Sequence, residues 1–409
     1  MIEAILSNPL LILGIALCAG FAFGKLLNLV KMPNVTGFVI AGILLGATLF
    51  NRRDALVQFD IVNDFALGFV AFVIGAELEY AKLKQIGASI LAIVLCETGV
   101  AFLLVWLATW AWTGSLPLAL ILGALASATA PAATVLTIRQ MRAKGPLTTT
   151  LLAVVGIDDA IALMIYAFAA AFARSALGTA SSFSFNSAIL SPVLHILGGV
   201  AIGSALGLLL IPFIRQVRNQ AELLILMCGG IILCDGIATQ FNFSELLSNM
   251  AFGFIVANFL RSSPSRILIA LDQLTPPVYT AFFVLAGAQL QLGTCVSSMF
   301  LMGLAVIYTL SRVTGKMSGA ALGSFIAKAP PVLKKYIGFG LVSQVGVAIA
   351  LAVIVRREFG NSGFTIHGFE FSELIVNLLL FTTIFTEIIG PLLTRFAIQK
   401  AGEEGKAEY

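Results

Sequence analysis

The chain has 409 residues, of which 59% are hydrophobic and only 11% are charged, and its net charge is +4. A soluble domain has about 25% charged residues, so this composition excludes a soluble globular protein. The mean hydropathy of +1.02 indicates an all-α, polytopic membrane protein. A membrane β-barrel would show short alternating segments rather than continuous apolar runs. The small net charge gives no reason to expect a nucleic-acid partner.

Apolar runs long enough to cross a bilayer recur along the whole chain. A helix needs about 17 to 25 residues to cross the roughly 30 Å hydrocarbon core. An odd number of spans places the two termini on opposite sides, and most Lys and Arg residues fall in cytoplasmic loops when the N-terminus is outside and the C-terminus is cytoplasmic. We predict about thirteen spans, near residues 8–28, 35–50, 60–80, 86–112, 116–138, 148–173, 190–214, 221–240, 245–260, 275–291, 297–326, 333–355 and 373–397.

Residues 1–398 are predicted to form a single membrane domain, and residues 399–409 a short, solvated cytoplasmic tail. Six spans precede and six follow the span at 190–214, so the two groups start from opposite sides of the membrane. This arrangement is typical of inverted-topology repeats. We place the repeats at approximately 8–173 and 221–397 and interpret 190–214 as a linker helix.

The fifth predicted span contains a helix-breaking sequence, "SATAPAATVLTIRQ" at 127–140. Pro131 lacks a backbone donor, and the hydroxyl groups of Ser127 and Thr129 can bind the freed carbonyls or a ligand. The alternative is an ordinary kink whose small residues allow close helix packing.

The twelfth span carries a similar sequence at the corresponding place in the second repeat, "SQVGVAIALAVIVR" at 343–356. Gly346 weakens the helix beside the polar pair Ser343 and Gln344. Two interrupted helices at matching positions of two repeats indicate a substrate site.

Asp158 and Asp159 lie in the apolar run "VVGIDDAIALMIYAF" at 154–168. A charged residue at the centre of a membrane helix costs about 2.5 to 3.5 kcal/mol, so buried acids are functional candidates by default. Burial and mutual repulsion favour the protonated acid, which can exchange its proton for a hard monovalent cation. Neighbouring residues point about 100° apart, which argues against the facing aspartate dyad of an intramembrane protease.

The segment "YTLSRVTGKMSGAALGSF" at 308–325 supplies buried cations, Arg312 and Lys316, on one helix face. Lys316 is the better candidate for a titrating partner, because lysine loses its proton readily when it is desolvated, whereas arginine stays charged. Static counter-ions are the alternative for both residues. Glu97 is our first choice as the partner of Arg312. Two further embedded acids, Asp235 and Glu387, could pair with Arg312, line a pathway or stay protonated.

The order of these features resembles the monovalent cation/proton antiporters, in particular the bacterial NhaA/NapA-like branch and the membrane domain of Kef-like proteins without their nucleotide-binding domain. The resemblance implies a homodimer, with a dimerisation domain framing a mobile core and an elevator-like motion. It also implies that Asp159 carries the ion while Asp158 interacts with Lys316. The matching stretches are "GFVIAGILLG" at 37–46, "FVIGAELEYAKLKQIG" at 72–87, "SATAPAAT" at 127–134, "GIDDAIAL" at 156–163, "FFVLAGAQLQL" at 282–292, "TGKMSGAALG" at 314–323 and "FTEIIGPLLTR" at 385–395.

The resemblance predicts a secondary transporter rather than an enzyme, located in the bacterial inner membrane and needing no cofactor. We expect it to exchange Na⁺ or Li⁺ for protons, with cation and proton competing for Asp159. The aspartate pair is similar to that of the electrogenic class. The alternatives are a K⁺/H⁺ antiporter of the same fold and a sodium-coupled symporter of organic anions. The ligand types cannot rank the cations, because selectivity depends on cavity size and ligand number.

Overall fold

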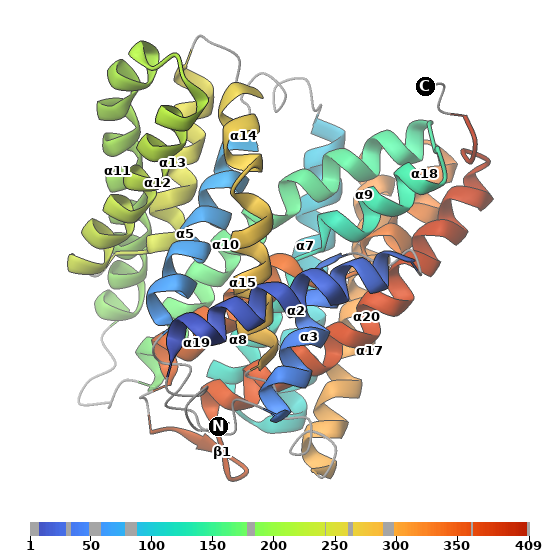
Figure 1. Ribbon diagram of the computed structural model, residues 1–409. Helices are drawn as coiled ribbons and strands as arrows, with labels where there is room; N and C mark the ends of the chain where they lie inside the picture. Colours follow the sequence, from blue (N-terminus) through green and yellow to red (C-terminus); the bar gives the residue numbers. More distant parts are fainter. Residues whose placement is uncertain are drawn as a thin grey trace. The chain divides into compact units, whose positions relative to one another are not determined.

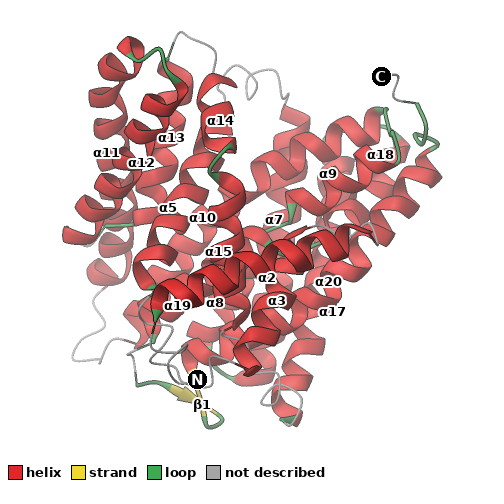
Figure 2. Cartoon of the chain, in the orientation of Figure 1, coloured by secondary structure: helices red, strands yellow, loops and turns green. Residues whose placement is uncertain are grey.

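The computed structural model describes residues 8–29, 34–48, 59–77, 88–177, 185–241, 243–260, 265–288, 298–360 and 363–406. These residues are overwhelmingly helical (Figure 2), which confirms the predicted class. Among them, the strands are two short antiparallel segments, β1 (Thr365–Ile366) and β2 (Phe369–Glu370).

The chain divides into two compact units, which are described separately. The helices α2 (Pro9–Leu29) and α15 (Thr275–Ala288) each contribute residues to both units. Unit 1 consists of Met1–Leu17, Leu49–Gln85 and Ser181–Phe282, and unit 2 consists of Cys18–Thr48, Ile86–Ala180 and Phe283–Tyr409.

In unit 1, α13 packs against both α5 and α11, and α12 contacts all three (Figure 1). Small residues allow this close approach. A Cβ atom added to Gly203 would lie 1.8 Å from the carbonyl oxygen of Ser248, and one added to Gly253 would lie 2.1 Å from that of Phe72. The helices of unit 1 are α5 (Asp60–Glu77), α11 (Phe185–Gln216), α12 (Gln220–Gln240), α13 (Glu245–Phe259) and α14 (Ser265–Asp272).

The helices of unit 2 include two pairs that continue one another after a break, α8 with α9 and η1 with α19. They are α3 (Asn34–Thr48), α7 (Ala88–Thr113), α8 (Leu116–Ser127), α9 (Pro131–Gln140), α10 (Pro146–Leu177), α17 (Met299–Ile326), α18 (Pro331–Tyr336), η1 (Ile337–Leu341), α19 (Gly346–Phe359) and α20 (Phe371–Ala401).

A row of glycines on α17 positions the two buried cations. Gly315, Gly319 and Gly323 recur every four residues and face α7, where added Cβ atoms would lie 2.6 to 2.7 Å from atoms of the α7 backbone. Because residues four apart share a helix face, this row brings the two backbones together. Lys316 directly follows the first of these glycines, and its side chain is fully buried.

Each of the predicted spans contains a helix or a pair of helices separated by a break. By length and apolar composition, six helices, or seven if the bent pair Pro331–Leu341 and Gly346–Phe359 counts as one span, could cross a membrane within the described residues. The remaining apolar helices are shorter, so the count of about thirteen crossings stays a prediction.

The C-terminal segment departs from the expected solvated tail. Helix α20 continues to Ala401 and ends at Gly402, whose φ of 66° is in the left-handed region that favours glycine. Glu403 is then only 3% exposed. Its carboxylate accepts hydrogen bonds from the amides of Leu147 (2.7 Å) and Thr148 (2.8 Å) at the start of α10. The tail therefore begins by capping a helix of the same unit.

Candidate ion-binding site

The first interrupted helix breaks between α8 and α9. Helix α8 ends at Ser127, and Ala128 adopts an extended conformation with φ of −68° and ψ of 143°. Helix α9 begins at Pro131. Proline disfavours helical geometry in the residue before it and has no N–H for the helix ladder. The interruption predicted from Pro131 is confirmed.

The second interrupted helix breaks after η1. The 3-10 helix ends at Leu341, and α19 begins at Gly346. The bend between Pro331–Leu341 and α19 is 46°. Gly346 has a φ of 28°, which is unfavourable for a residue with a Cβ atom. The break predicted beside Ser343 and Gln344 is therefore confirmed, and glycine is its local cause.

The two breaks are adjacent in unit 2. The backbone N–H of Ala130 donates to the carbonyl oxygen of Ser343 at 3.0 Å, and Thr134 Oγ1 donates to that of Gly340 at 2.9 Å. Each break thus supplies partners to the other, which reduces the number of unpaired backbone groups that an interrupted helix leaves in an apolar environment.

Arg312 binds the ends of both broken helices. Its guanidinium group donates to the carbonyl oxygens of Ala126 (3.1 Å) and Ala128 (2.7 Å), and to those of Val342 (2.5 Å) and Ser343 (3.3 Å). The side chain is fully buried. A cation at the carbonyl end of a helix is favourable because unpaired carbonyls make that end partially negative. Arg312 is therefore a structural clamp between the breaks.

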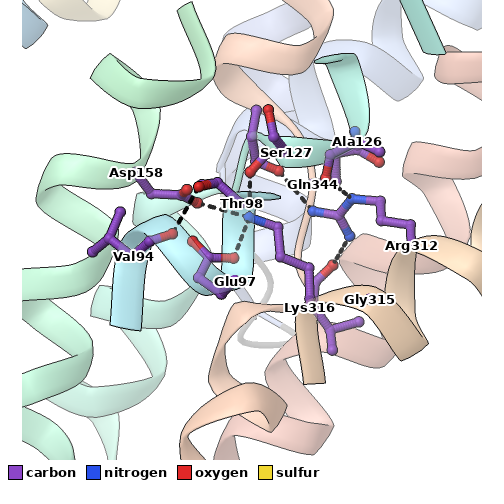
Figure 3. A network of polar contacts seen from close by, with 12 residues as sticks. Val94, Glu97, Thr98, Ala126, Ser127, Asp158, Arg312, Gly315, Lys316 and Gln344 are labelled. Carbon is purple, nitrogen blue, oxygen red and sulfur yellow. Dashed lines mark hydrogen bonds and ion pairs between the residues drawn. The ribbon is translucent and has the colours of Figure 1, made fainter. Parts of the chain in front are cut away.

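Lys316 lies at the centre of a buried ionic cluster (Figure 3). Its ammonium group is 2.7 Å from Glu97 Oε2 and 3.0 Å from Asp158 Oδ2, and the three side chains are fully buried. It also donates to the carbonyl oxygen of Ser127 at the end of α8. Helices α7, α10 and α17 and the first break thus meet at one lysine.

The expected pairing of Glu97 with Arg312 is wrong. Glu97 pairs with Lys316, whereas the hydrogen bonds of Arg312 go to backbone carbonyls. Sequence spacing could not distinguish the two cations, because they share a face of α17. The glycine row decides the outcome, since an added Cβ atom on Gly319 would lie 2.7 Å from the Cα atom of Glu97.

The remaining residues predicted to supply oxygen ligands, Asp159, Thr129 and Ser127, lie on α10 and around the first break. Asp159 is 5% exposed and follows Asp158 on α10, and Thr129 is 2% exposed within the first break. The hydroxyl group of Ser127 donates to the carbonyl oxygen of Ala124 in its own helix at 2.6 Å, so the backbone oxygen of this residue faces the cluster.

Gln344 has a partner that the sequence analysis missed. Its amide group donates to Tyr308 Oη at 2.8 Å and to the carbonyl oxygen of Leu125 at 2.8 Å. Tyr308 precedes Arg312 by four residues and Lys316 by eight, so all three share the buried face of α17. The four-residue spacing could therefore have predicted from the sequence that Tyr308 lies on the same face as Arg312 and Lys316.

Two adjacent broken helices with buried ionisable groups beside them are typical of a secondary transporter. A family model described as "Sodium/hydrogen exchanger, transmembrane" matches residues 11–400. The chain therefore belongs to the sodium/hydrogen exchanger family of multi-pass membrane proteins.

Curated relatives agree with this family. Cation/H(+) antiporter 17 of Arabidopsis thaliana is 24% identical over 436 residues, covering 98% of this chain and 50% of the relative. K(+) efflux antiporter 6 of the same plant is 30% identical over 82 residues, covering 20% of this chain and 13% of the relative. The chain thus spans half or less of the length of these relatives.

The fold is also similar to a solved structure. The sodium proton antiporter MjNhaP1 from Methanocaldococcus jannaschii superposes with a TM-score of 0.78 and 18% sequence identity, covering 98% of this chain and 99% of that chain. At this identity, the likeness concerns the fold.

Proposed function

We propose that this protein exchanges a monovalent cation, Na⁺ or Li⁺, for protons across a membrane, and that the exchange is electrogenic. The observation that carries the proposal is the pair Asp158 and Asp159, both at least 95% buried on α10. Asp158 already binds Lys316 beside the first break. We propose that the neighbouring Asp159 is the carboxylate that takes either a cation or a proton.

Competition for one group provides the coupling. A carboxylate with a bound cation or a bound proton is neutral, whereas an empty carboxylate leaves a charge that crosses an apolar layer poorly. We propose that the carrier moves between the two sides by an elevator-like motion, with Thr129 and the backbone oxygens of the first break as further ligands. The name of the K(+) efflux relative favours K⁺ as the second candidate cation.

The remaining expectations belong to the same proposal. The protein would be a homodimer in a bacterial inner membrane, with its N-terminus outside and its C-terminus in the cytoplasm. The inverted repeats at 8–173 and 221–397 would be joined by the linker helix at 190–214. Labelling of single cysteines introduced at each end, with a reagent that does not cross membranes, tests the orientation.

The test uses protein reconstituted in liposomes with a trapped pH dye, at a clamped membrane potential. We expect Na⁺ or Li⁺ gradients to drive proton movement that responds to the potential. The variant Asp159→Asn should abolish it, whereas Glu222→Gln, at an exposed acid in the first turn of α12, should not. Exchange at the wild-type rate in Asp159→Asn would disprove the assignment. If no cation moves protons, uptake of organic anions tests the symporter alternative.

A further inference from the structure

Glu387 on α20 is a buried carboxyl group that the proposed mechanism does not use. It is fully buried, and Thr36 of α3 donates a hydrogen bond from Oγ1 to its Oε2 at 3.1 Å. Its second oxygen, Oε1, has no hydrogen-bond partner among the described residues. Among the described charged side chains, Arg312 interacts electrostatically with Glu387. The hydrogen bonds of Arg312, however, go to backbone carbonyls.

Glu387 lies beside the second break. The preceding residue, Thr386, donates from Oγ1 to the carbonyl oxygen of Gln344 at 3.5 Å. One turn after Glu387, a Cβ atom added to Gly390 would lie 2.0 Å from Ser343 Oγ. The acid is therefore flanked along α20 by two contacts with the interrupted segment.

Unpaired polar groups occur both on α20 and at the second break. Ser343 Oγ and Thr383 Oγ1 are buried and have no partner within the described residues, and Thr383 precedes Glu387 by four residues. Pro391 has no N–H to donate to the carbonyl oxygen of Glu387.

The buried charges of the described residues of unit 2 do not balance without a bound proton. In the described part of its apolar helices, four carboxyl groups and two basic groups are at least 95% buried. By count, the two basic charges offset two of the four carboxylates, and in the proposed mechanism a cation or proton on Asp159 neutralises a third. One carboxyl group remains, and burial of an uncompensated charge is strongly unfavourable. These groups are Glu97, Asp158, Asp159 and Glu387, with Arg312 and Lys316.

The position of the bases identifies the remaining acid. Glu97 and Asp158 share Lys316, while no base of the described residues lies within ion-pair distance of Glu387. We propose that Glu387 is a second proton-binding site, separate from Asp159, and that the transporter works only while Glu387 holds its proton. The predicted effect of Glu387 on transport rests on the proposed antiport function. The prediction that Glu387 holds a proton does not.

This proposal has a definite sign for pH dependence. When Glu387 loses its proton at alkaline pH, a buried negative charge appears beside the second break, and transport should decline. The hydrogen bond from Thr36 stabilises an ionised carboxylate more than a neutral acid. Without that bond the proton is retained to higher pH, so the alkaline decline should also move to higher pH.

The experiment compares the pH profiles of cation-driven proton flux in liposomes for four proteins: wild type, Glu387→Gln, Thr36→Val and the control Thr382→Val. Gln mimics the neutral acid, so Glu387→Gln should lose the alkaline decline. Thr36→Val should shift the decline upward by about 0.5 to 1 pH unit. Thr382 is a buried threonine whose hydroxyl group donates within α20, to the carbonyl oxygen of Leu379, so Thr382→Val should follow wild type.

Infrared spectroscopy gives a readout that does not depend on transport. The wild type should show the carbonyl stretch of a buried protonated carboxyl group, and Glu387→Gln should lack that band. The proposal is overturned if the band is the same in both proteins or if Glu387→Gln keeps the wild-type alkaline decline. Loss of ²²Na⁺ binding in Glu387→Gln would also overturn it, by making Glu387 a cation ligand.

If Glu387→Gln does not fold, the proposal can still be tested on the wild type and Thr36→Val. The wild-type band can be followed during a pH titration, and Thr36→Val should move its disappearance to higher pH. If the wild-type protein moves no protons with any cation, the proposed antiport fails, and the infrared band still decides whether Glu387 holds a proton.

Discussion

The contact between Glu403 and the start of α10 allows a local prediction. The Glu403 carboxylate accepts hydrogen bonds from Leu147 N (2.7 Å), Thr148 N (2.8 Å) and Thr148 Oγ1 (2.7 Å). The backbone also connects the segments, because Lys144 N donates to the carbonyl oxygen of Glu403 at 3.1 Å. The variant Glu403→Ala removes the carboxylate and leaves this backbone bond in place.

The magnitude follows from the two amides that lose their acceptor. Loss of a capping side chain costs about 0.5 to 2 kcal/mol. Removal of a negative charge from a helix N-terminus adds about 0.3 to 1 kcal/mol. A total near 2 kcal/mol raises the opening equilibrium of the first turn of α10 roughly 30-fold. The effect is confined to that turn, because the interaction between a charge and a helix terminus falls off within the first turn.

Hydrogen exchange measured by mass spectrometry checks this value, using peptides that cover residues 145–150. We expect Glu403→Ala to speed exchange there and to leave the α7 peptides unchanged. The matched control is Glu404→Ala, because Glu404 is the neighbouring acid and is exposed. Equal exchange in Glu403→Ala and wild type, or an equal increase in Glu404→Ala, would refute the capping role.

Two further substitutions test the packing of α17. Arg312→Lys keeps the charge but loses the planar fork that reaches four carbonyls, so the free energy of unfolding should fall by about 1 to 3 kcal/mol. An unchanged thermal midpoint in detergent would contradict the clamp. Gly319→Ala places a Cβ atom 2.6 Å from the carbonyl oxygen of Cys96 and should cost about 1 to 3 kcal/mol. Gly99→Ala, which meets nothing within 4 Å, is its control, and equal midpoints for the two variants would contradict the proposed close contact.

Local chemistry made the breaks predictable. Proline at residue 131 and glycine at residue 346 act on the backbone within one turn, so their effect is visible in the sequence. The apolar runs likewise predicted a helix or a broken pair in every proposed span. The number of membrane crossings was harder to predict from the sequence, because several of the apolar helices are shorter than a full span.

Long-range partners were not predictable from spacing alone. The sequence placed Arg312 and Lys316 on one helix face, but it assigned Glu97 to the wrong one of the two. The buried position of Glu403 was also missed, since its partners are more than 250 residues away in the chain. Such contacts depend on how helices pack, and for Glu97 the small residues on α17 set that packing.

The sequence by itself determined the membrane class, the helical segments, the two interruptions and the acids within apolar runs that suggested the family. These properties depend on hydrophobicity and on backbone chemistry within a few residues. The tertiary structure alone decided that Lys316 joins Glu97 to Asp158, that Arg312 binds the carbonyl ends of both breaks and that Glu387 lies against the second break. Those assignments depend on the distances between helices, which the packing of side chains fixes and a linear pattern does not contain.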